Sequence, residues 1–97
     1  MQIVIGKFIV KAEERDAFIE GRRAAMVRSR AEPGCITYAF TPDQIDADIV
    51  VLTERWLDRD SLAAHAKGLK TAPPSTGPDP ISREVFMYET TNEGRAL

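Results

Sequence analysis

The residues best suited to chemistry are few, and two of them lie close together in the second half of the chain. His65 is the only histidine, and an imidazole ordinarily titrates near pH 6.5, which suits general base catalysis. Its alternative role is that of a half-buried helix residue bonded to a backbone carbonyl. Trp56 carries an indole N–H that can donate to a ligand oxygen, although a tryptophan at the end of a strand is often only part of the core.

Glu54 is the most unusual acidic residue, because it alternates with the apolar residues Leu52 and Trp56. If it is buried, its carboxylate needs a partner such as Arg22, or its pKa is raised. A structural ion pair or a position at the rim of the core is the alternative. Tyr38 can add a hydroxyl group to the same region.

Cys35 and the arginines have weaker claims to a chemical role. Cys35 follows a Pro-Gly turn with no histidine near it in sequence, which favours a small packed apolar residue. A single cysteine excludes an internal disulfide and is typical of a reducing compartment. Four arginines crowd the first expected helix, at positions 22, 23, 28 and 30. They favour a solvated helix face, with an anion contact or a dimer contact as the alternative.

The elements that must position these residues follow from the pattern of apolar residues. Strands are expected at 3–10, 36–41, 48–56 and 81–90, and helices at 13–31 and at 60–68, the second capped by Asp58. Residues 70–80 hold four prolines and predict an irregular loop, and the polar residues 91–97 predict a loose tail. This order predicts a single α+β domain over 1–97 with the ferredoxin-like fold, a four-stranded antiparallel sheet with two helices on one face.

The strands are apolar on both faces, although the two helices can cover only one. One set of alternating residues is Val4, Phe8, Val10, Val50, Leu52, Ile81, Val85 and Met87, and the opposite set is Ile3, Ile5, Ile9, Ile49, Val51, Phe86 and Tyr88. Leaving about seven such side chains uncovered forgoes on the order of 10–20 kcal/mol, as much as the stability of a whole domain. We therefore expect a two-fold homodimer in which two sheets face each other as a barrel.

The composition excludes several other classes. The formal net charge of −2 argues against nucleic-acid binding. No apolar run approaches the roughly 20 residues that cross a bilayer, and the first residues do not resemble a signal peptide, so a cytoplasmic protein is expected. We find no glycine-rich phosphate loop, paired-cysteine metal site or serine elbow.

Two segments resemble the antibiotic biosynthesis monooxygenase family of dimeric α+β barrels. These are Glu32-Pro33-Gly34-Cys35-Ile36-Thr37-Tyr38, and Glu54-Arg55-Trp56 followed by Ser61-Leu62-Ala63-Ala64-His65. The resemblance covers about residues 1–69. It implies a ligand pocket between sheet and helices, lined by Trp56, Leu62 and His65. The candidate catalytic residues are then His65 and Trp56, and the candidate substrate-binding residues are Tyr38, Leu52, Glu54, Leu62 and Arg22.

The resemblance also implies an activity. Family members include oxygenases that convert phenols or hydroquinones to quinones with neither flavin nor metal, so the expected function is a cofactor-independent monooxygenase acting with dioxygen on a quinol-like or polycyclic phenol. The alternatives are a non-catalytic ligand-binding or stress-associated dimer, and an isomerase of a small phosphorylated or dicarbonyl compound with Arg22 and Arg23 as anion contacts. The chain departs from the family over residues 67–80, which are proline-rich and lack a second histidine. That departure argues against haem degradation, which uses an axial histidine downstream of the second helix.

Overall fold

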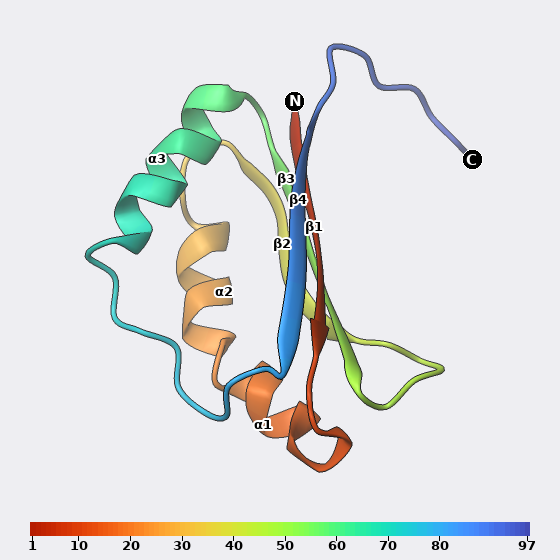
Figure 1. Ribbon diagram of the computed structural model, residues 1–97. Helices are drawn as coiled ribbons and strands as arrows, with labels where there is room; N and C mark the ends of the chain where they lie inside the picture. Colours follow the sequence, from red (N-terminus) through yellow and green to blue (C-terminus); the bar gives the residue numbers. More distant parts are fainter.

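The computed structural model spans residues 1–97 and is built on one antiparallel sheet (Figure 1). The strands are β1 (Gln2–Ile9), β2 (Cys35–Pro42), β3 (Ile49–Trp56) and β4 (Ser82–Glu89). Their order across the sheet is β2-β3-β1-β4. This is the ferredoxin-like arrangement, so the fold prediction from the sequence is confirmed.

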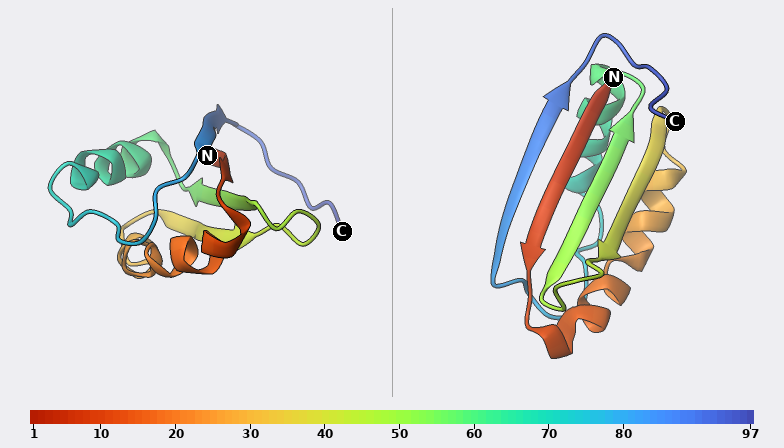
Figure 2. Two further views of the ribbon diagram at one scale, coloured as in Figure 1. Left: turned by 60° about the horizontal axis from the view of Figure 1, so that its bottom comes forward. Right: turned by 90° about the vertical axis from the view of Figure 1, so that its right-hand side faces the viewer.

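All helices lie on one face of the sheet, as Figures 1 and 2 show. They are the 3-10 turn η1 (Ala12–Glu14) and the helices α1 (Arg15–Glu20), α2 (Arg23–Arg30) and α3 (Arg59–Leu69). The expected single helix over 13–31 is therefore wrong, because it is broken at Gly21 and Arg22.

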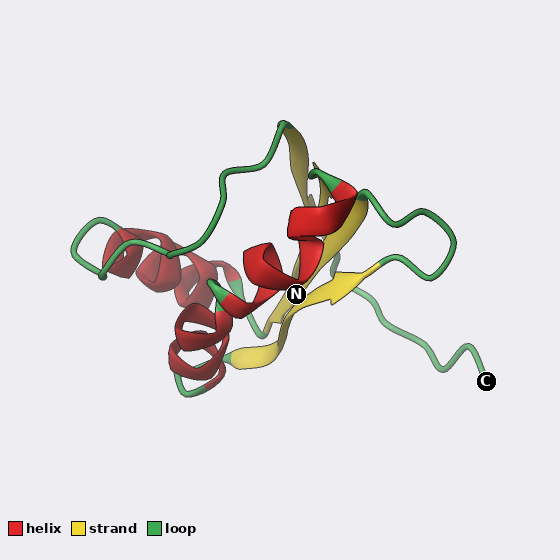
Figure 3. Cartoon of the chain, turned by 90° about the horizontal axis from the view of Figure 1, so that it is seen from below, coloured by secondary structure: helices red, strands yellow, loops and turns green.

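The proline-rich loop explains this break. The Thr76 amide donates to the Gly21 carbonyl at 3.1 Å, and a Cβ at Gly21 would collide with the Thr76 carbonyl oxygen. Gly77 has φ +82° and lies against the Ala17 carbonyl, so it also needs to be a glycine. The loop thus packs its backbone directly on the helix break, and Figure 3 shows it passing beside these helices on its way from α3 to β4.

The core lies between the helices and the middle strands. Its buried side chains are Phe8, Val10, Phe18, Tyr38, Val50, Leu52 and Trp56. The helices pack mainly on β2 and β3, and none packs extensively over β4. Val85 and Met87 therefore remain 44% and 58% exposed, although they point to the same side of the sheet as the buried Val4.

The other sheet face, which we call the open face, carries no helix (Figure 2, right). Its apolar residues on β1, β3 and β4 are Ile3, Ile5, Ile9, Ile49, Val51, Phe86 and Tyr88. The polar residues Lys7, Thr53, Arg55, Ser82 and Glu84 of these strands lie on the same face. Ile5, Phe86 and Tyr88 are 41%, 58% and 55% exposed. The excess of apolar residues predicted from the sequence is thus present on this face, where the paired Lys7 and Glu84 interrupt it between Ile5 and Ile9.

A β-bulge at the start of β2 changes the expected alternation of that strand. Cys35 is paired with Trp56 and Thr37 with Arg55, so Ile36 is the extra residue. Ile36 is exposed and Cys35 packs against the core. The sequence pattern, which places Ile36 in phase with Tyr38, gives the wrong face for Ile36 because one inserted residue reverses the alternation.

The outer edge of β2 is covered by side chains of α2. Arg30 Nε donates to the Tyr38 carbonyl at 2.8 Å, and the Phe40 amide donates to Met26 Sδ at 3.4 Å. Two backbone groups that face away from β3 are thereby satisfied within the chain.

Candidate functional site

The sheet register places Tyr38 and Glu54 side by side on the helix-covered face, with Trp56 two positions further along β3. Helix α3 places His65 beside these three residues. This helix begins at Asp58, whose side chain accepts from the Ser61 amide at 2.8 Å. Gly34, with φ +82°, lets the turn before β2 pack against the Ser61 side chain, which fixes the start of α3 beside the first part of β2.

Glu54 is 6% exposed and is held by an aromatic donor. Trp56 Nε1 donates to Glu54 Oε1 at 2.8 Å, and His65 Nε2 lies 3.9 Å from the same oxygen. Burial raises the pKa of the Glu54 carboxyl, and the hydrogen bond from Trp56 and the nearby His65 only partly oppose this effect. The structure thus pairs Glu54 with Trp56 and His65 and not with Arg22.

His65 is 4% exposed, and its ring is enclosed on several sides. Its Nδ1 lies 3.1 Å and 3.3 Å from the two carboxylate oxygens of Glu32. The ring centroid is 4.6 Å from that of Trp56 and 5.5 Å from that of Tyr38. Glu32 is a member of this cluster that reasoning from the sequence missed. The signal was its place just before the Pro33-Gly34 turn, in one of the two segments that carry the family resemblance.

Tyr38 is 6% exposed, and burial, helped by the negative charge of Glu54, raises its pKa to about 12. Its phenol therefore stays protonated at neutral pH and can donate a hydrogen bond. A tyrosine in this state stabilises a developing oxyanion better than it removes a proton.

The remaining expected residues lie around this cluster or away from it. Leu52 is buried and Leu62 is partly buried, and both pack in the adjoining core. Arg22 is separate, because its guanidinium lies 3.5 Å from the centroid of the Phe18 ring and donates to the Phe18 carbonyl at 3.0 Å. Burial lowers the pKa of Arg22, while nearby Asp79 opposes that shift.

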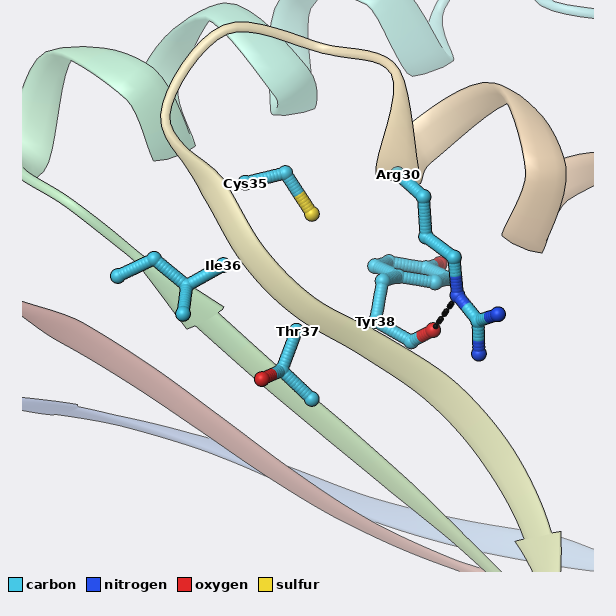
Figure 4. A pocket seen from close by; sticks show the side chains of 5 residues that line it. All are labelled: Arg30, Cys35, Ile36, Thr37 and Tyr38. Atoms are coloured by element: carbon cyan, nitrogen blue, oxygen red, sulfur yellow. Dashed lines mark hydrogen bonds between the residues drawn. The ribbon is translucent and has the colours of Figure 1, made fainter.

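The surface nearest to the cluster is a cavity of about 290 Å³ at the edge of β2 (Figure 4). It is lined by Arg30, Cys35, Ile36, Thr37 and Tyr38. Burial, with the negative charges of Glu32 and Glu54, raises the pKa of the Cys35 thiol, so the thiolate needed for nucleophilic attack is disfavoured. None of the five cavities of the chain is lined by Glu54, Trp56 or His65. In the isolated chain these three side chains are packed together.

No three histidine, cysteine, aspartate or glutamate side chains converge in a way that could hold a metal ion. No helix is both long enough and apolar enough to cross a bilayer.

The fold and this cluster define a class of protein. The sequence profile of the antibiotic biosynthesis monooxygenase family matches residues 1–69, and the chain belongs to this family. An uncharacterized protein of Synechocystis is 33% identical over 63 residues, which are 65% of this chain and 43% of that relative. The chain thus spans less than half the length of the curated relative it matches.

Solved structures share the fold over almost the whole chain. A Deinococcus radiodurans protein provisionally named an antibiotic biosynthesis monooxygenase has a TM-score of 0.75 and 17% identity, with 100% of this chain and 99% of that chain covered. A Nitrosomonas europaea protein with the same provisional name has a TM-score of 0.70 and 24% identity, with coverage of 95% and 100%. The haem degrader MhuD of Mycobacterium tuberculosis, solved with two haems in its active site, has a TM-score of 0.73 and 12% identity, with coverage of 98% and 100%. At these identities the similarity shows the fold alone.

Proposed function

We propose that this protein is a homodimeric, cofactor-independent monooxygenase that oxidises a small quinol-like or polycyclic phenol with dioxygen. The observation that carries the proposal is the buried carboxyl of Glu54 in contact with the Trp56 indole and the His65 imidazole, inside an otherwise apolar core. A buried carboxyl with a raised pKa is costly for folding, and such groups gather at catalytic sites. Membership of the monooxygenase family supports the same class of chemistry.

The reaction needs little from the protein. A phenol with a ring hydrogen opposite its hydroxyl takes up one dioxygen and yields one quinone and one water. The phenolate transfers an electron to dioxygen more readily than the neutral phenol does, so the first requirement is a base. Glu54 supplies the basic group, beside His65. The Tyr38 phenol, which stays protonated at neutral pH, supplies a donor for the oxyanion, because the single indole N–H of Trp56 already donates to Glu54.

The helix-covered face of the sheet is bare over β4, and this bare part can receive the aromatic ring of the substrate. Tyr38, Glu54, Val4 and Met87 form one row across the four strands. Met87 is 58% exposed and Val4 is 7% exposed, so a ring resting on Met87 and neighbouring Val85 faces Glu54 across Val4. A flat apolar ligand gains from burial there, on the sheet face that also carries the Glu54 carboxylate.

The homodimer is part of the proposal because of the open face. Ile5, Phe86 and Tyr88 each leave about half of their surface in water, and a contiguous patch of this kind marks an interaction surface. A second copy presents the same patch, as a two-fold interface requires.

Haem degradation is not proposed, although MhuD shares the fold. His65 is the only histidine, and its two ring nitrogens face the carboxylates of Glu32 and Glu54. Neither nitrogen is directed at a space in which an iron atom could be bound.

The test is oxygen uptake by metal-free protein with a panel of phenols and hydroquinones. Each phenol should give quinone and water, and each hydroquinone should give hydroxyquinone and water. We expect turnover by the wild type and a lower rate of turnover in His65→Ala, with the dimer retained. Leu69→Ala, on the exposed end of α3, is the matched control and should keep full activity. Tight binding of a phenol without oxygen uptake would show that the protein is a ligand-binding dimer and not an oxygenase. If phosphate alone raised the thermal stability of the protein, the isomerase would be favoured.

A further inference from the structure

We propose that Glu54 is the catalytic base of the site and that Glu32 is a positioning residue, which fixes the His65 ring so that its unprotonated Nε2 faces Glu54. This inference rests on the proposed function for the step on substrate. From the sequence, the single histidine His65 was the candidate base. In this proposal Glu54 is the base, and Glu32 orients His65 beside it.

The surroundings of His65 leave it no nitrogen for a substrate. Nδ1 is 3.1 Å from Glu32, Nε2 faces Glu54, and the aromatic rings of Trp56 and Tyr38 lie against the imidazole. A general base must come within about 3 Å of the proton that it removes. His65 therefore acts through the carboxylates beside it.

Glu54, in contrast, has one oxygen without a partner. Trp56 and His65 both approach Oε1, and neither contacts Oε2. Oε2 is also absent from the fully buried polar atoms that lack a hydrogen bond, which belong to Gln2, Arg15 and Ser29. The second oxygen therefore has no hydrogen-bond partner within the chain and can accept from the hydroxyl of a bound phenol.

The geometry selects the form of the imidazole. The Nδ1 distance to Glu32 is that of a hydrogen bond, so Nδ1–H donates to this carboxylate. In the neutral ring this leaves Nε2 without a proton, and its 3.9 Å separation from Glu54 Oε1 is longer than a hydrogen bond. A ring that takes up a second proton forms an ion pair with Glu54 at this distance. Glu32, with 28% of its side chain exposed, links the buried ring to solvent.

The proposed step is then a single proton transfer. The O–H bond of the phenol breaks, its proton goes to Glu54 Oε2, and the electron pair remains on the phenolate oxygen. Burial raises the pKa of Glu54, which makes it a stronger base than an exposed carboxylate. The groups that face Glu54 are Trp56 on its own strand, Tyr38 on β2 and His65 on α3, with Glu32 behind His65.

The role of Glu32 can be tested without any substrate, because the chain has one histidine and its nitrogen signals are unambiguous. ¹⁵N NMR of the neutral wild-type ring should show protonated Nδ1 and unprotonated Nε2. In Glu32→Gln this preference should be lost, in Glu32→Asp it should be largely kept, and in Glu54→Gln it should be unchanged. A wild-type ring protonated at Nε2, or a Glu32→Gln ring identical to wild type, would overturn the assignment.

The role of Glu54 is tested with 4-nitrophenol, whose ionised form absorbs visible light. Below the pH at which the free probe ionises, wild type should ionise the bound probe, and Glu54→Gln should bind it in the neutral form. Absence of the ionised band in wild type, or its persistence in Glu54→Gln, refutes the role of base even if no substrate is ever turned over. Failure of oxygen uptake alone would defeat the proposed function and leave both spectroscopic results standing.

With an oxidised phenol in hand, kinetics give a further test. Glu54→Gln should lower kcat by about 10²–10⁴-fold. His65→Asn should lower kcat less than Glu54→Gln does. It should also keep the acid limb of the pH profile, which is the fall in kcat at low pH, because the titrating base Glu54 is still present. Disappearance of that limb in His65→Asn would show that the histidine is the base.

Discussion

Replacing Phe86 by glutamate should abolish the proposed dimer, whereas the same change at the adjacent Met87 should not. The two side chains are equally exposed, at 58% each, but they project from opposite faces of β4. Phe86 lies on the open face, opposite Ile5, and Met87 lies on the helix side, opposite Val4. General surface hydrophobicity therefore cannot account for a difference between the two variants.

The size of the effect follows from the exposed surface. Burying the exposed half of a phenylalanine contributes about 1–1.5 kcal/mol, and a two-fold interface counts it twice. The two introduced carboxylates would also be desolvated without partners, which costs at least a further few kcal/mol. A total above about 4 kcal/mol raises the Kd of the dimer by about a thousandfold or more.

Light scattering and sedimentation over a dilution series measure this directly. Wild type and Met87→Glu should give twice the chain mass of 10.8 kDa, and Phe86→Glu should give the chain mass itself with unchanged circular dichroism. A monomeric wild type, or a Phe86→Glu variant that dimerises as tightly as wild type, would refute the reasoning from the open face. Dissociation by Met87→Glu alone would move the interface to the other side of the sheet.

Three further predictions concern the site and the loop. Because the pKa of Tyr38 is raised from 10.0 to about 12, its contribution to stability is complete below pH 10, and roughly 2–3 kcal/mol of it is lost as pH rises to 12. Urea unfolding should show this loss in wild type and not in Tyr38→Phe. The pKa of Glu54 is raised above its ordinary value of 4.5, so its protonated form stabilises the fold below pH 4.5 and this stabilisation is lost as pH rises. Glu54→Gln should therefore have a larger free energy of unfolding than wild type at pH 7, and the difference should vanish in acid. Gly21→Ala forces the Thr76 backbone away and should lower stability by about 1–3 kcal/mol while exposing the loop to protease. Gly68→Ala, with no atom within 4 Å of its new methyl group, should instead raise stability by about 1 kcal/mol. The opposite ranking would show that the loop does not rest on the helix break.

Much of the fold followed from the sequence, because alternation and turn residues are local signals. The strands, the capped helix α3 and the two apolar sheet faces were all predicted within one or two residues of their bounds. The break at Gly21 was not predictable, because its cause is a contact with Thr76, fifty-five residues away in sequence. The reversed face of Ile36 was missed for a related reason, since a single inserted residue leaves no mark on composition.

The site shows the same limit. Trp56 and Glu54 share a strand face, so their contact was predictable from spacing alone. The contact between Glu32 and His65 joins residues thirty-three positions apart and depends on the angle at which α3 crosses the first part of β2. An acidic residue in a turn is normally solvated, and nothing in its type distinguishes Glu32 from the other acids of the chain.

The two side chains that cover the outer backbone of β2 bear on how copies of this chain assemble. Growth by strand addition requires a free edge on both sides of each copy, so that every new molecule offers the next one a template. Here Arg30 and Met26 occupy one edge, and a copy that joined at β4 would present no equivalent edge to a third. Growth of one continuous sheet by strand addition should therefore stop once two β4 edges have joined.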